Sequence, residues 1–94
     1  MKLLGKELLT QFMEEHANAR EWVENWISDV EGATWKTPQD IKDRYPPASF
    51  LKDNVVIFNV KGNKYRLEVK VAYNSVTVIA TWAGTHAEYT KKFK

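Results

Sequence analysis

The first half of the chain has apolar residues at the spacing of amphipathic helices. Between residues 6 and about 16, apolar side chains recur every three to four positions, with acidic and amide side chains between them. A second apolar stripe covers residues 22–30; Asn18 is placed to cap it, and Gly32 is expected to end it. The two stripes predict a helical hairpin that covers one face of a sheet.

A third, shorter helix is predicted from a capping pattern. Thr37 is followed by Pro38 and Asp40, which are residue types preferred at the N-cap, the first and the third helical positions. The helix is expected to run to about Arg44, because the proline pair that begins at Pro46 cannot continue it.

The second half of the chain has the pattern of β-strands. Residues 55–60 are nearly all apolar, which fits a strand buried on both faces. Residues 65–71 alternate between apolar and mostly charged side chains, so one face of this strand is expected in the core and the other in solvent. Residues 76–82 predict a third strand, with Val78, Ala80 and Trp82 on one side.

Turn residues separate these strands. Gly62 and Asn63 stand at the centre of residues 61–64, and both tolerate the positive φ of a tight hairpin turn. Residues 74–75, Asn-Ser, predict a second turn. Gly84 is expected to end the third strand, which leaves residues 85–94 as a loop or a short terminal helix.

Composition limits the fold and the chemistry. A chain of 94 residues with 44% hydrophobic content is enough for one core and too short for two, so residues 1–94 are expected to form a single α+β domain. The absence of cysteine excludes disulfides, thiolate metal sites and thiol nucleophiles, and a cytoplasmic protein is expected. No segment has the apolar run of a signal peptide or a membrane span.

Charge is distributed unevenly along the chain. Residues 1–47 contain six Lys or Arg and nine Asp or Glu, a formal charge of −3, whereas residues 48–94 contain eight and three, a charge of +5. This asymmetry favours an anionic partner for the second half, although small domains also distribute charge unevenly for solubility.

Cations gather at the first hairpin of the predicted sheet. Lys61, Lys64 and Arg66 lie within six residues, and a sheet face with this charge can hold phosphates, with Arg binding them through two nitrogens. The alternative is a solvated face on which Glu68 and Lys70 balance one another.

A histidine and a tyrosine follow the third strand. In an antiparallel meander, His86 and Tyr89 are expected at the sheet edge where the second strand begins, near Lys64 and Arg66. Such a set can cleave an RNA phosphodiester, since one group takes the 2′-hydroxyl proton, another stabilises the phosphorane and a third protonates the leaving oxygen. No metal is needed. The alternative is that His86 caps the terminal segment through Thr85 and Glu88, and that Tyr89 packs on the sheet.

The remaining candidates favour structural roles. His16 has no second histidine at the spacing of metal ligands, so no metal role is predicted for it. The four tryptophans are expected mainly in the core, and the chain has no phosphate-binding glycine loop, nucleophile elbow or zinc signature. No cofactor is therefore implied.

Two ordered motifs carry a family resemblance. The string FNVKGNKYRL at residues 58–67 and GTHAEY at residues 84–89 resemble the HigB family of toxins from bacterial type II toxin-antitoxin operons. Trp-Lys-Thr-Pro at residues 35–38 and Ala-Ser-Phe-Leu at residues 48–51 recur in the same order. The resemblance covers most of the chain.

The resemblance implies a RelE-like fold, with an N-terminal helical hairpin and a short helix packed on an antiparallel sheet. It also implies a metal-independent endoribonuclease that cleaves mRNA on the ribosome, inhibits translation and is neutralised by a HigA-type antitoxin. The residues expected in catalysis are Lys64, Arg66, His86 and Tyr89, and those expected to bind RNA are Lys61, Lys64, Arg66, Lys91 and Lys92.

The chain departs from its relatives at two positions. Many of them have Arg in the third strand where this chain has Thr81, and Asp after the tyrosine where it has Thr90. The first difference removes a phosphate contact, so the chain is a weak nuclease, an attenuated toxin, or a toxin that relies on Lys91 and Lys92 instead. Two further alternatives are a noncatalytic RNA or ribosome binder, and a protein-interaction module whose basic face holds an acidic partner.

Overall fold

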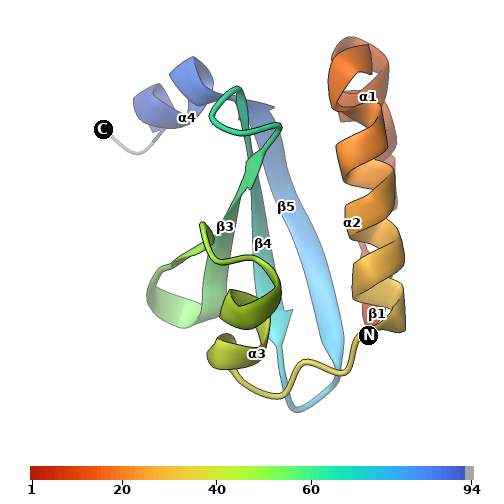
Figure 1. The fold of residues 1–94 in the computed structure, drawn as a ribbon, viewed down its shortest axis with the longest axis vertical. Coiled ribbons are helices and arrows are strands. Elements are labelled where there is room, and N and C mark those ends of the chain that lie inside the picture. The colour runs from red at the N-terminus through yellow and green to blue at the C-terminus, as the bar shows by residue number, and fades with distance from the viewer. Residues whose placement is uncertain (93–94) are drawn as a thin grey trace.

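The computed structural model describes residues 1–92, which form four α-helices and one five-stranded sheet (Figure 1). The elements are β1 (Lys2–Leu4), α1 (Lys6–Glu15), a 3-10 turn (Ala17–Ala19), α2 (Arg20–Gly32), α3 (Pro38–Arg44), β2 (Ser49–Phe50), a second 3-10 turn (Lys52–Asn54), β3 (Val55–Val60), β4 (Tyr65–Ala72), β5 (Thr77–Thr85) and α4 (His86–Lys92). The predicted α+β class, with helices on a mostly antiparallel sheet, is confirmed.

The sheet has the strand order β1-β5-β4-β3-β2. All neighbours are antiparallel except β1, which pairs in parallel with the start of β5, Leu3 opposite Val78. The sequence did not predict β1, because three residues are too few to show a period and their partner strand lies more than 70 positions away. β1 nevertheless completes the sheet beside α1 and α2.

The predicted helical hairpin is confirmed as α1 and α2, which lie on one side of the sheet (Figure 1). Phe12 of α1 contacts Tyr65 of β4, and Trp26 of α2 contacts Phe58 of β3, so the hairpin covers one face of the sheet as expected. The expected cap was wrong. α2 begins at Arg20 after the 3-10 turn and has no side-chain cap. Asn18 instead uses its side-chain oxygen to accept a hydrogen bond of 2.6 Å from the Tyr65 hydroxyl, which ties the hairpin to β4.

α3 has the capping box that its sequence predicted. The Asp40 amide donates to the Thr37 hydroxyl oxygen, the Asp40 carboxylate accepts from the Thr37 amide, and Pro38 occupies the first turn. The Lys36 amide donates to the same carboxylate, and this bond is the main reason that the pKa of Asp40 is lowered. α3 ends at Arg44, before the proline pair.

β4 follows the predicted alternation, with its apolar side chains in the core and its charged side chains on the opposite face, which we call the outer face. β3 pairs with it so that Val56, Phe58 and Val60 face the core. Ile57 points to the outer face and is still only 2% exposed. The prediction that β3 is buried on both faces is therefore correct at this position.

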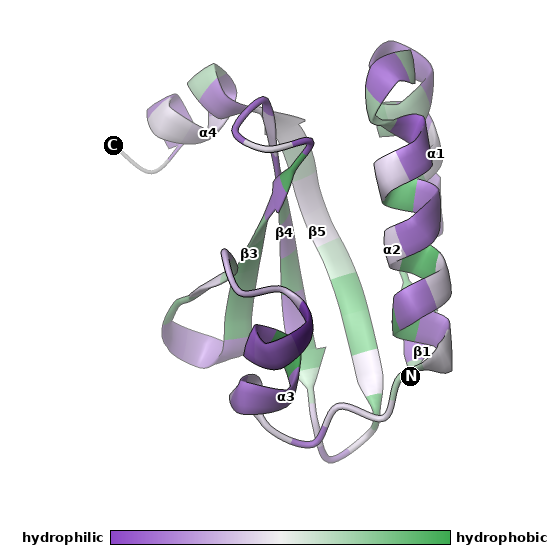
Figure 2. Cartoon of the chain, in the orientation of Figure 1, coloured by the Kyte–Doolittle hydropathy of each residue, from purple (hydrophilic) through white to green (hydrophobic). Residues whose placement is uncertain are grey.

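A β-bulge at Thr81 changes the sides of β5. Ala80 lies opposite Val69 and Trp82 lies opposite Glu68, so Thr81 is an extra residue. The extra residue shifts the alternation of side chains by one position, so Trp82 lies on the outer face with Glu68 and not on the face of Val78 and Ala80. The prediction that these three residues share one side was wrong. Figure 2 shows that β5 is strongly hydrophobic near β1 and paler toward α4.

Two further predictions need correction at the ends of the strands. Gly84 does not end β5; it pairs with Arg66 inside the strand, which continues to Thr85. In the β3–β4 turn the positive φ angles occur at Lys61 and Gly62, not at Asn63. The Asn63 side-chain oxygen accepts a hydrogen bond from Arg66.

Candidate functional site

α4 is attached to the sheet through its first turn. The Thr85 amide donates to the Glu88 carboxylate at 2.8 Å, and the Glu88 amide donates to the Thr85 hydroxyl at 3.1 Å. These bonds lower the pKa of Glu88, and the charge of His16 acts in the same direction. The cap of this helix is therefore the Thr85–Glu88 pair, and His86 does not supply it.

The β3–β4 turn lies beside the start of α4 (Figure 1). The backbone amide of His86 donates to the Lys64 carbonyl at 3.0 Å, and Tyr65 pairs with Thr85 in the next position of the sheet. The two motifs singled out in the sequence, residues 58–67 and 84–89, therefore meet at one end of the sheet.

Arg66 occupies the centre of this end of the outer face. Its guanidinium donates to the Tyr65 carbonyl at 3.0 Å and to the Asn63 side-chain oxygen at 3.4 Å. Its central carbon lies 5.8 Å from the centroid of the Tyr89 ring. An arginine has more N–H groups than these two bonds use, so the half-buried side chain is fixed and still able to donate to an anion.

Tyr89 packs against the ring of Trp82, with the centroids 6.3 Å apart. The Lys92 amine lies 5.8 Å from the Trp82 ring and 3.8 Å from the Glu68 carboxylate. α4 therefore packs on the Trp82 side chain, which lies on the outer face because of the bulge. Tyr89 contacts both Arg66 and Trp82, so it has a packing role whatever chemistry it performs.

Thr81 bonds to the same carboxylate. Its hydroxyl donates to the Glu68 side chain at 2.6 Å. Thr81 is therefore a short neutral donor at this position, and the Glu68 charge is balanced by Lys92.

The structure brings four predicted residues to one end of the sheet: Lys64, Arg66, His86 and Tyr89. Lys64 and His86 are exposed, and Arg66 and Tyr89 are half-buried. Lys61 lies in the exposed turn, and Lys91 is exposed in the last turn of α4, to which Lys92 also belongs. The expected terminal helix is confirmed up to Lys92; positions 93–94 lie outside the described residues.

We call Lys64, Arg66, His86 and Tyr89, together with the residues that support them, the cluster. Sequence reasoning missed the supporting residues. Glu68 and Trp82 belong to it through α4 and the bulge. His16 lies close enough to Glu88 to lower the pKa of that carboxyl group, and the His16 ring lies 4.9 Å from the ring of Tyr65. Only the alternation of charged residues on β4 gave a signal, and it identified Glu68 as a surface charge without its partners.

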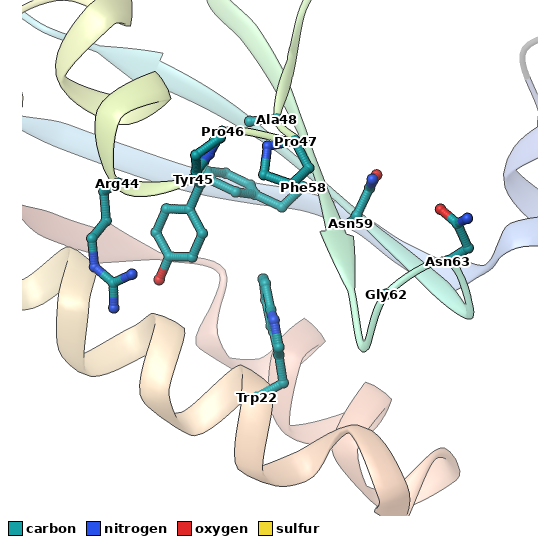
Figure 3. Close-up of a pocket in the computed structure, with 10 residues that line it drawn as sticks. All are labelled: Trp22, Arg44, Tyr45, Pro46, Pro47, Ala48, Phe58, Asn59, Gly62 and Asn63. Carbon is teal, nitrogen blue, oxygen red and sulfur yellow. The ribbon is translucent and has the colours of Figure 1, made fainter.

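A pocket of about 420 Å3 opens next to the cluster (Figure 3). Trp22 projects into it from α2, Phe58 closes it from β3, and the turn after α3 forms another wall. Asn59 and the hairpin turn complete the lining. Its residues are Trp22, Arg44, Tyr45, Pro46, Pro47, Ala48, Phe58, Asn59, Gly62 and Asn63.

One wall of the pocket is held by a small polar network. The Tyr45 hydroxyl donates to the Asp29 carboxylate at 2.5 Å, and the Arg44 guanidinium donates to the same oxygen at 2.6 Å. Burial, together with this bond and the Asp29 charge, raises the pKa of Tyr45 far above its ordinary value. Tyr45 therefore keeps its proton, and Arg44 is neutralised by its partner.

The tryptophans divide into two groups. Trp26 and Trp35 are buried, as predicted. Trp22 and Trp82 are only half-buried, the first in the pocket and the second under α4. For these two the interpretation as core residues was incomplete.

Acid–base groups, cations and a phenol on one surface are suited to a phosphodiester substrate. Within residues 1–92 there is no group of three or more His, Asp or Glu side chains that could hold a metal ion. No helix in the same range is both long and apolar enough to cross a membrane.

Comparison with known families gives a match over most of the chain. A family model described as HigB_toxin, RelE-like toxic component of a toxin-antitoxin system, matches residues 19–92. This range includes both motifs and every residue of the cluster except His16. No match to a curated protein was found.

Proposed function

The chain belongs to the HigB toxin family, the RelE-like toxic components of toxin-antitoxin systems, and we propose that it is an endoribonuclease that cleaves mRNA on the translating ribosome. Its action would inhibit translation in the cytoplasm, and a HigA-type antitoxin would neutralise it. The observation that carries the proposal is the placement of Arg66 over Tyr89, beside the backbone bond between Lys64 and His86.

The proposed reaction is a transfer within the RNA strand. A proton leaves the 2′-hydroxyl for His86 or Tyr89, and the 2′-oxygen attacks the adjacent phosphorus. The bond from phosphorus to the 5′-oxygen breaks, and that oxygen receives a proton from the other member of the pair. The products are a 2′,3′-cyclic phosphate and a 5′-hydroxyl end, so atoms and charge balance without a further reactant.

Arg66 is the group proposed to stabilise the phosphorane. Negative charge on the non-bridging oxygens increases as the 2′-oxygen attacks, and a guanidinium already fixed by Tyr65 and Asn63 needs little reorganisation to meet it. Lys64 lies at the same edge and adds positive charge. Lys61, Lys91 and Lys92 are proposed to contact the RNA backbone on either side, where they hold the strand without reading its sequence.

The test is induction of the chain alone in a bacterium, followed by mapping of mRNA ends. Growth arrest is expected, with new 5′-hydroxyl ends inside translated regions and none in the same transcripts when initiation is blocked. Normal growth with intact transcripts would refute the nuclease proposal. Co-expression of the antitoxin should restore growth.

A noncatalytic RNA or ribosome binder is the second candidate, and Thr81 is the observation that favours it. The hydroxyl at this position bonds to Glu68 and offers no positive charge to a phosphate. In that case purified ribosomes would bind the chain while their mRNA stayed intact, and Arg66→Ala would change binding without any cleavage to lose.

A further inference from the structure

The pocket beside the cluster has an open backbone edge. β2 pairs with β3 only at Val56 and Ile57, so within residues 1–92 no strand pairs with this edge beyond Ile57. The Leu51 amide donates to the Val55 carbonyl, which places the backbone groups of Val55 on the β2 side. Since a strand repeats every two residues, the N–H and C=O of Asn59 point to the same side, into the pocket.

The sequence explains why this edge stays open. The chain that leads into β2 would lie alongside Asn59, but Pro46 and Pro47 have no N–H to donate to a neighbouring strand. It turns away instead, and the Ala48 amide closes that turn on the Tyr45 carbonyl at 2.9 Å. The result is a backbone donor and acceptor at Asn59, beside the pocket, that no strand within residues 1–92 pairs with on this side.

An aromatic face lies in the same pocket. Trp22 is half-buried, its ring centroid is 6.0 Å from that of Tyr45, and the rings are inclined at 53°. The two rings therefore do not stack on each other, and the indole remains free to pack against another flat group. Figure 3 shows the indole projecting from α2 into the space bounded by Phe58 and Gly62.

The pocket is continuous with the catalytic cluster. Asn63 lines it, and the side-chain oxygen of the same residue accepts the hydrogen bond from Arg66. Asn63 thus lies between a group bound in the pocket and Arg66, the residue proposed to hold a phosphate. The lysines of the turn, Lys61 and Lys64, are exposed around it.

From these observations we infer that the pocket binds one base of the RNA strand, with Trp22 stacked on the base and the backbone of Asn59 bonded to its edge. Each nucleobase has a donor and an acceptor side by side on its Watson–Crick edge, which matches an exposed N–H and C=O. The volume of about 420 Å3 is in the range of small-molecule sites.

A peptide strand is a poorer occupant. Strand addition needs several consecutive free backbone groups, whereas here only residues 58–60 extend beyond β2 before the hairpin turn. The base site deepens the proposed function and rests on it, because it names the part of the RNA that lies next to the cleaved bond.

The test uses a fluorescent hexanucleotide of 2′-O-methyl RNA, which lacks the attacking hydroxyl and cannot be cleaved. Its binding is measured by fluorescence anisotropy at low salt, together with six derivatives that each lack one base. Removal of the base at one position is expected to weaken binding to the unmodified protein by roughly 5- to 100-fold.

Trp22→Ala should weaken binding of the intact RNA by a similar factor. Binding by this variant should no longer depend on whether the base at that position is present. Trp22→Phe is the matched control, which keeps a stacking ring and should retain most of the discrimination. Asn59→Pro is an independent variant: it removes the N–H that faces the pocket and no bond to β4, so it should also lose the discrimination with Trp22 in place.

The two proposals fail differently. Suppose that the unmodified protein cleaves RNA, and that Trp22→Ala and Asn59→Pro both show the same differences in affinity among the seven hexanucleotides as the unmodified protein. The base-site proposal is then refuted, and the nuclease proposal is not. If the unmodified protein binds none of the RNAs and cleaves no transcript, both are refuted. Thermal melting of each variant shows whether a loss comes from unfolding, and the Asn59 variant decides the question if Trp22→Ala does not fold.

Discussion

The carbon at the centre of the Arg66 guanidinium lies 5.8 Å from the centroid of the Tyr89 ring, and this contact joins the start of the central strand β4 to the C-terminal helix. Both residues also contact other groups, since Arg66 bonds to Tyr65 and Asn63 while Tyr89 packs on Trp82. The cation and the phenol are therefore placed together by β4, the β3–β4 turn and α4, and each can be changed separately.

Arg66→Ala is expected to lower mRNA cleavage by about 100- to 1,000-fold, because it removes the charge proposed to stabilise the phosphorane. The measurement is the rate of cleavage of mRNA on purified ribosomes. Lys70→Ala is the matched control, since Lys70 is an exposed cation on the same face of the same strand but away from α4. Equal effects of the two changes would mean that only general positive charge matters.

Tyr89→Phe separates proton transfer from packing. The ring that contacts Arg66 and Trp82 remains, so the melting temperature should stay within a few degrees of the original. If the phenol transfers a proton, cleavage falls by about 100-fold or more, and the pH dependence of the rate changes. Full activity in Tyr89→Phe, with loss of stability in Tyr89→Ala, would assign the residue to packing alone.

Thr81→Arg is expected to strengthen RNA binding. The new side chain would start on the outer face beside Glu68, where the threonine hydroxyl now bonds. An additional phosphate contact should steepen the dependence of log K on log salt by about one unit. Thr81→Gln is a neutral variant of comparable reach, and the same salt slope in both variants would contradict an added phosphate contact.

The cap of α4 should depend on pH through Glu88. The bonds from Thr85 favour the carboxylate, so the pKa of Glu88 in the folded protein is below its ordinary value of 4.5. This stabilising contribution is therefore complete above pH 4.5 and is lost as the pH falls through the lowered value. The protection factors of the α4 amides against hydrogen exchange, corrected for the intrinsic rate at each pH, should fall in that acidic range, and the transition should be absent in Glu88→Gln.

Val76 is a β-branched residue with a φ of 52°, in the left-handed region that such side chains avoid. Its carbonyl accepts a hydrogen bond from the Lys2 amide at 2.9 Å, which holds the position in place at the start of the parallel pair. The side chain is 45% exposed, so little burial is lost on substitution.

Val76→Asn should therefore stabilise the protein by about 1 kcal/mol, since asparagine tolerates this conformation better. Thermal unfolding is expected to shift upward by roughly 4–8 °C. Val76→Ala serves as the comparison, because it shortens the side chain and keeps a Cβ. A larger gain from alanine than from asparagine would show that backbone strain is not the cause.

Much of the fold could be predicted because its signals are local. The capping box at Thr37 and Asp40 lies within four residues, and the alternation along β4 follows directly from one buried and one open face. These patterns do not depend on what the rest of the chain does. The same holds for the hairpin of α1 and α2.

The parts that were missed depend on partners distant in sequence. The bulge at Thr81 is defined only by the register with Glu68 and Val69, and it decides which side Trp82 takes. The open edge at Asn59 exists because another segment turns away from it. No window of sequence around either residue contains this information. For that reason the cluster was predicted in outline, without Glu68 and Trp82, and the pocket was not predicted.

The two faces of the sheet separate the residues proposed for activity from the residues that form the core. Arg66, Glu68 and Trp82 project from the outer face, whereas the large core cluster occupies the other. Mutations that silence the cluster need not pass through an unstable intermediate that proteases would remove. Under the proposed function, substitutions on the outer face would abolish cleavage and leave the core intact, so a folded and inactive copy is accessible through changes on one face of the sheet.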